Sequence, residues 1–90
     1  PLSYPSAGSV FRNPSKDQPA GKLIEDANLK GYKEGGATIS TKHANFIINE
    51  NKATSKDIIN LISHIKKIIK EKDNIDLILE QEIVKWDSYE

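Results

Sequence analysis

The feature that most constrains the fold of this chain is a long amphipathic segment over residues 55–72. Its apolar side chains recur three or four positions apart and so fall along one side of an α-helix: Ile58, Leu61, Ile62, Ile65, Ile68 and Ile69. Thr54, followed three residues later by Asp57, forms a capping-box pattern that marks a helix start. We therefore predict a helix from Ser55 to Lys72 whose isoleucine-rich face is buried.

Shorter segments before and after this helix have the composition of β-strands. Residues 37–40 and 45–50 contain β-branched runs, and the stretch between them is too short for a helix, so we expect two neighbouring strands. Residues 77–86 are partly alternating and predict a final strand. Residues 1–21, which hold all four prolines, should be mostly loop, with a short strand possible at residues 9–11.

An apolar repeat at helical spacing predicts a second, shorter helix over residues 20–28. Asp17-Gln18-Pro19 is a helix-start signal, and Gly31 is the expected C-cap. Residues 31–36 are predicted to form a turn. Because helices and strands do not alternate strictly, an α+β fold is favoured. We expect a small mixed or antiparallel sheet of three to four short strands packed against two helices.

Composition narrows the classes of function. The chain has 13 basic and 13 acidic side chains, which gives no global reason to expect a nucleic-acid or membrane partner. It has no cysteine, so disulfides and cysteine metal sites are excluded, and we predict no metal. No segment approaches the ~18 consecutive apolar residues of a membrane span. Because methionine is absent and the chain begins at Pro1, we expect residues 1–90 to be one domain of a larger protein.

The opening motif PSAGSVFRNP presents one hydroxyl, Ser9, on a glycine-flanked turn. Serines in such loops commonly bond to their own backbone. The alternative is a catalytic hydroxyl, for which only His43 and His64 could act as the base. A serine hydrolase is disfavoured, since the chain contains no GxSxG elbow.

Three charged residues have a structural explanation, and a functional one is also open for the two glutamates. Lys30 follows the first predicted helix, where a cation suits the helix dipole. Glu80 and Glu82 point to one side of the predicted final strand, where like charges are usually exposed. A buried member of this pair would be a candidate acid or charge stabiliser.

Four motifs occur in the order and spacing of one family: PSAGSVFRNP, AGKLIEDANLKGY, GGATISTKHANFIIN and LEQEIVKW. Over about residues 5–84 the chain resembles the C-terminal, substrate-binding domain of the UDP-N-acetylenolpyruvoylglucosamine reductase family. The resemblance implies a cytoplasmic enzyme of peptidoglycan precursor synthesis. It implies FAD, reduced by NADPH, as the hydride source for converting UDP-N-acetylglucosamine enolpyruvate, a UDP-sugar, to UDP-N-acetylmuramate. The family's own N-terminal FAD-binding domain would hold the flavin, and nothing in this chain resembles that domain.

The resemblance also implies roles for single residues. Ser9 corresponds to the general acid that protonates the carbanion left by hydride addition. Asn13, Lys30 and His43 correspond to substrate-binding positions, with Lys30 facing the diphosphate. By the local LEQE-Ile pattern the catalytic glutamate corresponds to Glu82, which we favour; an ungapped count from His43 gives Glu80 as the alternate.

The chain departs from the family pattern at Lys85-Trp86, where a glycine usually closes the last motif. The family's active-site arginine and a lysine before the first motif lie N-terminal to the residues of this chain. A function of another class stays open, namely a non-catalytic binding module that recruits a partner through the isoleucine-rich helix. The reductase interpretation requires the candidate residues around one cleft, whereas the module requires an exposed apolar patch on the helix.

Overall fold

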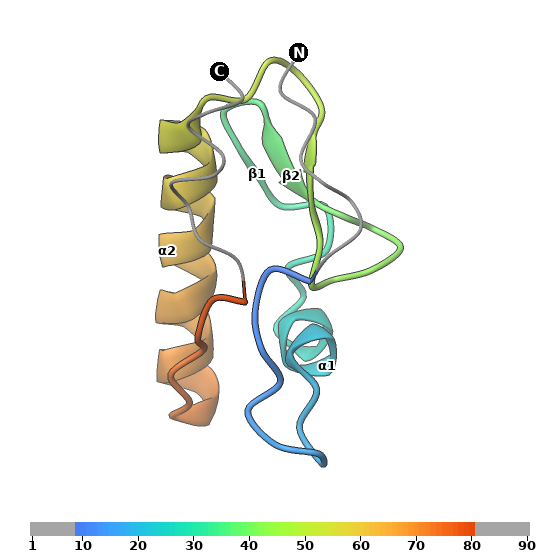
Figure 1. Cartoon of the computed structure of the whole chain (residues 1–90), viewed down its shortest axis with the longest axis vertical. Coiled ribbons are helices and arrows are strands. Elements are labelled where there is room, and N and C mark those ends of the chain that lie inside the picture. Colours follow the sequence, from blue (N-terminus) through green and yellow to red (C-terminus); the bar gives the residue numbers. More distant parts are fainter. Residues whose placement is uncertain (1–8, 81–90) are drawn as a thin grey trace.

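Two helices and one antiparallel sheet make up the fold, as seen in a computed structural model that describes residues 9–80 (Figure 1). The elements follow in the order α1 (Ala20–Asp26), β1 (Lys33–Glu34), β2 (Ala37–Ile39), β3 (Ile47–Asn49) and α2 (Ser55–Asp73). One half of α2 lies along the sheet and the other half lies beside α1, so α2 is one layer and the remaining elements are the other. This arrangement is the α+β fold that the sequence predicts.

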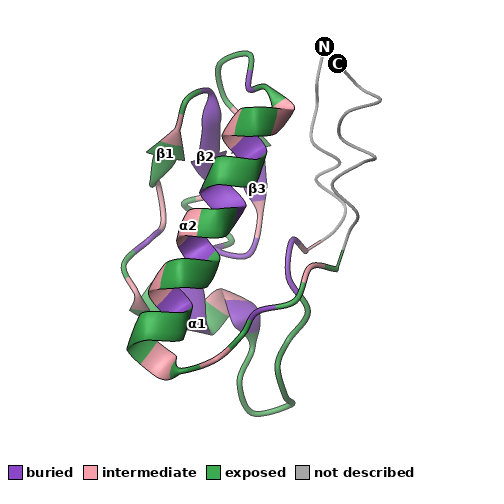
Figure 2. Ribbon diagram, turned by 90° about the vertical axis from the view of Figure 1, so that its left-hand side faces the viewer, coloured by how far each residue is buried: buried purple, intermediate pink, exposed green. Residues whose placement is uncertain are grey.

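The helix α2 supplies one wall of the hydrophobic core. Its buried side chains are Ile58, Leu61, Ile62, Ile65 and Ile69. Figure 2 shows these buried positions recurring between exposed ones along the helix. At its start, Thr54 Oγ1 accepts the N–H of Asp57, and the Asp57 carboxylate accepts the N–H of Thr54, each at 3.1 Å. The capping box is confirmed, and so is the buried face except at Ile68, which is only partly buried. The helix ends one residue later than predicted, at Asp73.

A Gly-Gly turn joins β1 to β2, which pair antiparallel. Gly35 has a φ of 57°, the left-handed conformation that tight hairpin turns require. Gly36 is needed because a Cβ there would lie 2.0 Å from the carbonyl oxygen of Asn51. The prediction of a plain turn over residues 31–36 is wrong in part, since the charged pair before the glycines forms a short edge strand.

The central strand β2 also pairs antiparallel with β3, with Thr38 opposite Ile48, as predicted for these two segments. Thr38 is buried, and its hydroxyl donates a 2.8 Å hydrogen bond to the Glu50 carboxylate. Glu50 also pairs with Lys33 on β1. Hydrogen bonds from Lys33 first and Thr38 second lower the pKa of Glu50 below its usual range. These contacts link β1 and β2 to the residue that directly follows β3.

The first helix ends two residues earlier than predicted. Asn28, with a φ of 62°, takes the left-handed conformation that closes it. The Leu29 N–H donates to the Ile24 carbonyl at 3.3 Å, as in a Schellman cap, and both side chains are buried. Gly31 as the C-cap is therefore wrong. Asn is one of the few residues other than glycine that adopt a positive φ, and the burial of Leu29 in the core favours the earlier stop.

The N-terminal segment pairs with the segment that follows α2. Phe11 forms an isolated antiparallel bridge with Leu79, and the two segments run side by side in Figure 1. Two hydrogen bonds flank the bridge, each 2.8 Å long: Arg12 N–H to Ile78 O and Glu80 N–H to Val10 O. The predicted final strand is thereby corrected, because residues 77–80 form this one bridge and do not join the main sheet. Residues 81–86 of that prediction lie outside the described residues.

Candidate functional site

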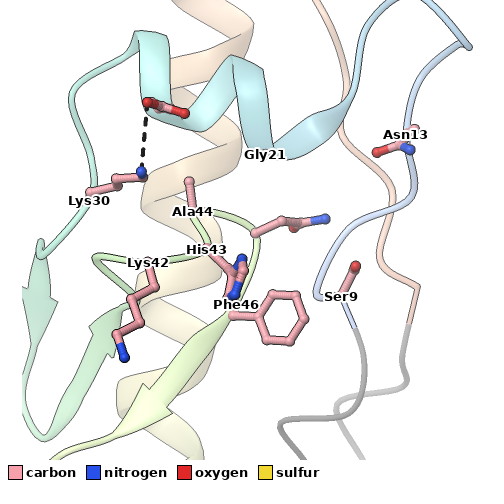
Figure 3. Close-up of a pocket in the computed structure, with 10 residues that line it drawn as sticks. Ser9, Asn13, Gly21, Lys30, Lys42, His43, Ala44 and Phe46 are labelled. Carbon is pink, nitrogen blue, oxygen red and sulfur yellow. Dashed lines mark ion pairs between the residues drawn. The ribbon is translucent and has the colours of Figure 1, made fainter.

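An open pocket of about 300 Å³ lies between the N-terminal segment, α1 and the loop that leads into β3 (Figure 3). Its walls come from residues 9–13, residues 21–30 and residues 42–46. Four of the residues that line the pocket are candidate site residues from the sequence analysis: Ser9, Asn13, Lys30 and His43. The fold thus brings together candidates that are distant in the sequence.

Ser9 lies at one edge of the pocket, at the start of a firmly held segment. The two residues that follow, Val10 and Phe11, are each only 1% exposed. Ser9 itself is half-buried and faces the wall that carries His43 and Phe46 (Figure 3). Core packing of the two residues that follow therefore holds the main chain beside the hydroxyl.

Asn13 has a structural role in addition to its predicted one. Its Oδ1 accepts the N–H of Ala20, the first residue of α1, at 2.9 Å. Pro19, at the N-cap position, has no side-chain hydrogen bond to offer, so Asn13 caps the helix from outside. Because Oδ1 is engaged by a donor, the Nδ2 group is left to donate to a ligand.

Lys30 reaches the pocket from the loop after α1. Its side chain is 31% exposed, and its Nζ lies 3.6 Å from Glu25 Oε2 (Figure 3). The prediction that Lys30 meets the helix dipole is wrong, because α1 ends at Asp26 and no basic residue occupies its last turn. Lys30 is instead a point charge held at the pocket wall by a carboxylate, and an anionic ligand could compete for it.

His43 lies on a compact loop on the other side of the pocket. Ser40 Oγ accepts the N–H groups of Lys42 and His43, each at 3.1 Å, which closes the loop into a turn. The imidazole lies against the Phe46 ring, with centroids 5.4 Å apart and planes 45° apart. This wall therefore presents the His43 imidazole, the Lys42 ammonium and the Phe46 ring to a ligand in the pocket.

The structure describes one of the two candidate catalytic glutamates, Glu80, and not the other. Glu80 does not line the pocket, and its Oε1 lies 3.3 Å from Arg12 Nε in an exposed ion pair. Glu82, the preferred candidate, lies outside the described residues. Its role remains a prediction.

The alternative functions find little support in the described part of the chain. Ser9 and His43 share no hydrogen bond there, so the base that a serine hydrolase needs is not in place. His64 stacks on Tyr32, with ring centroids 4.3 Å apart, and does not line the pocket. The isoleucine-rich face of α2 is buried, and Ile59 is the large apolar residue of that helix exposed beyond a third of its surface.

Two pocket residues escaped the sequence analysis. Lys42 is exposed and lines the pocket. Because it directly precedes the candidate His43, the sequence could have predicted its place at the site. Asn45 is 8% exposed and makes three hydrogen bonds to the segment after Ser9. An asparagine directly before a buried apolar strand is itself a signal, because a buried amide must find partners.

The pocket suits a phosphate-bearing ligand with a small reacting group. It offers lysine charges, an amide donor and one hydroxyl on a fixed segment. The Gly35-Gly36 turn cannot cradle a phosphate, since Asp57 and Asn51 already fill the space beside it. Between residues 9 and 80, no helix could cross a membrane and no three His, Asp or Glu side chains gather as for a metal ion.

Fold and pocket together define a small α+β domain with a polar, partly cationic pocket. The chain matches the family model "UDP-N-acetylenolpyruvoylglucosamine reductase, C-terminal domain" over residues 1–84. It belongs to that family.

Curated relatives agree with this assignment. The chain is 56% identical over 84 residues to the UDP-N-acetylenolpyruvoylglucosamine reductase of Caldanaerobacter subterraneus subsp. tengcongensis. The aligned region covers 93% of this chain and 28% of that protein. The chain is 54% identical to the Bacillus subtilis protein of the same name, covering 27% of it. The chain therefore spans little more than a quarter of the length of these relatives.

A solved structure gives the same result for the fold. The crystal structure of UDP-N-acetylenolpyruvylglucosamine reductase (MurB) from Thermus caldophilus superposes with a TM-score of 0.70 at 42% identity. The match covers 86% of this chain and 26% of that one. The predicted resemblance to this family is confirmed.

Proposed function

We propose that this chain is the substrate-binding domain of an FAD-dependent, NADPH-using reductase of the cytoplasm. The complete protein would convert UDP-N-acetylglucosamine enolpyruvate to UDP-N-acetylmuramate for peptidoglycan synthesis. The observation that carries the proposal is the convergence of the four nominated residues on one pocket in a member of this family. In this proposal the hydride comes from a flavin held by the family's N-terminal FAD-binding domain, which nothing in this sequence resembles.

The role of Ser9 follows from the chemistry of the double bond. Hydride adds to the outer carbon of the enolpyruvyl group and forms a C–H bond there. The π electrons move to the inner carbon, beside the carboxylate, and that carbon then takes a proton. In this proposal the Ser9 O–H supplies the proton, and water later restores it. A positioned acid of this kind contributes about 10²–10⁴-fold to the rate.

The other residues bind and orient the substrate in this proposal. Lys30 exchanges its contact with Glu25 for the diphosphate, where a compact ammonium suits phosphate oxygens. Asn13 donates through Nδ2 while its Oδ1 keeps α1 in place. His43 contacts the substrate from the opposite wall. Glu82 is the proposed carboxylate that stabilises the intermediate, since Glu80 is paired with Arg12.

The test is Ser9→Ala in the complete reductase that carries this chain, with each half-reaction followed by stopped-flow flavin absorbance. Flavin reduction by NADPH should stay near the parent rate, because that step needs no proton from Ser9. Reoxidation by the enolpyruvyl substrate should slow by about 10²–10⁴-fold. Ser63→Ala, an exposed serine on α2, is the matched control and should leave both rates unchanged.

Two carboxylate variants complete this experiment. Glu82→Gln should slow reoxidation, whereas Glu80→Gln should not. If Ser9→Ala reoxidises at the parent rate, Ser9 is a turn residue and the proposed acid is wrong. If the parent protein does not oxidise its flavin with the enolpyruvyl substrate at all, the proposed function itself is wrong.

A further inference from the structure

Asn45 is a buried polar residue whose hydrogen bonds all reach the segment that begins with Ser9. Its Oδ1 accepts the Phe11 N–H at 3.0 Å, and its Nδ2 donates to the Phe11 carbonyl at 2.8 Å. Its own carbonyl accepts the Val10 N–H at 2.9 Å. A main-chain N–H can only donate and a carbonyl can only accept, so the orientation of this side-chain amide is fixed by its partners.

The geometry of the segment explains why Phe11 depends on this amide. On one edge, Val10 O and Arg12 N–H bond to the segment after α2. In an extended chain the polar groups of the intervening residue face the other edge, where no strand runs. Asn45 takes the place of that strand and satisfies both main-chain groups of Phe11. Without it, two buried polar groups would be left unpaired.

The same residue connects two walls of the pocket. Asn45 belongs to the loop that carries Lys42, His43 and Phe46, and it lines the pocket itself. The segment that it holds carries Ser9 on the facing wall (Figure 3). The spacing between the hydroxyl and the opposite wall therefore depends on these three hydrogen bonds.

We infer that Asn45 is a positioning residue for Ser9, holding the serine hydroxyl at the distance that proton transfer to the substrate requires. The inference rests on the proposed function of Ser9 as the proton donor. A shift of about 1 Å in such a group can cost on the order of 100-fold in rate. A purely structural role for Asn45 would instead lower stability without a selective effect on the step that uses Ser9.

The test uses Asn45→Ala in the complete reductase, with Asn49→Ala as the matched control. Asn49 also accepts a main-chain N–H, that of Ala53 at 2.8 Å, but it does not line the pocket. Asn45→Ala should slow flavin reoxidation by the enolpyruvyl substrate by about 10–100-fold and leave reduction by NADPH unchanged. Asn49→Ala should change neither rate.

A double variant separates positioning from structure. If Asn45 acts through Ser9, then Asn45→Ala should add nothing to the loss already caused by Ser9→Ala, because the two form one unit. Additive losses would overturn the inference. Reoxidation at the parent rate in Asn45→Ala, while Ser9→Ala is slow, would overturn it and leave the proposed function standing. Parent rates in both single variants would overturn the proposed role of Ser9.

If the Asn45→Ala variant does not fold, Asn45→Asp tests the same inference. It keeps the shape of the side chain and the acceptor for the Phe11 N–H, and it replaces only the donor to the Phe11 carbonyl. Reoxidation should again slow selectively. Amide hydrogen exchange of the parent gives a readout that needs no variant and no activity: the Phe11 N–H should be protected. Rapid exchange at that amide would overturn the inference.

Discussion

The α2-and-sheet region and the pocket region of this domain are built in different ways. α2 and its capping box are specified within one stretch of chain, and the Gly-Gly turn joins strands that are adjacent in sequence. The pocket is assembled from three separated stretches, and single side chains hold them in place, Asn13 at α1 and Asn45 at the N-terminal segment. The first region is specified by repeated apolar contacts, whereas the second depends on a few hydrogen bonds made by single side chains.

This difference predicts how each region responds to substitution. Damage to α2 or the sheet should lower the stability of the whole domain, because the core is continuous. Damage to the pocket hydrogen bonds should change function more than stability. The variants below test whether the two regions can be separated in this way.

The largest effect on stability is expected from Ile62→Ala. Ile62 is 3% exposed in the core face of α2, and truncating a buried isoleucine costs about 2–5 kcal/mol. Lys66→Ala on the exposed face should change stability by less than about 0.5 kcal/mol. Urea unfolding followed by circular dichroism gives both values. Equal losses from the two variants would mean that the faces of α2 are misassigned.

A smaller effect, with opposite signs in the two regions, is expected from two glycine-to-alanine changes. At Gly36, a Cβ would lie 2.0 Å from Asn51 O, so alanine should destabilise by about 1–3 kcal/mol. At Gly21, within α1, the nearest atom would be Asn45 Cβ at 3.6 Å. Alanine there should stabilise the helix by about 0.5–1 kcal/mol. Urea midpoints that move in the same direction would contradict this assignment.

An effect at the lower end of this range concerns the start of α2. Thr54→Ala removes the hydroxyl of the capping box and should cost about 1 kcal/mol, measured by thermal unfolding. The partner carboxylate adds a pH dependence. Hydrogen bonds from the N–H groups of Thr54 and then Gly36 lower the pKa of Asp57 below its usual range.

The direction of this pH dependence follows from the lowered pKa. The contribution of Asp57 is complete above its pKa in the unfolded chain, about 3.9, and is lost as the pH falls through the lower folded value. Asp57→Asn removes this dependence. The stability of the variant should therefore fall less steeply than that of the parent below about pH 4. Parallel curves in acid would show that the carboxylate contributes nothing.

The sequence predicted the elements that local pattern determines. The isoleucine period and the Thr54–Asp57 pair located α2 to within one residue, because both signals lie inside the helix itself. The end of α1 was misplaced, since Asn28 and Gly31 both tolerate a positive φ and only the packing of Leu29 on the core selects between them. The edge strand β1 was missed because two charged residues carry no periodic signal.

The candidate site was predictable only through family resemblance. Ser9, Asn13 and Lys30 carry no pattern that would place them in one pocket, because loop contacts over long separations bring them together. The hydrogen bond from Asn13 to Ala20 and those from Asn45 to Phe11 depend on main-chain positions that composition does not encode. The catalytic carboxylate stays a prediction, since Glu82 lies outside the described residues.

The bridge between Phe11 and Leu79 closes almost the whole described chain into a single loop. Contacts between residues so far apart in sequence are entropically slow to form, whereas helices and tight hairpins form early. We therefore expect α2 and the β1–β2 hairpin to precede the docking of residues 9–13 during folding. A folding intermediate that precedes this docking step would have most of the secondary structure but no pocket. Ligand binding would therefore report the completion of folding.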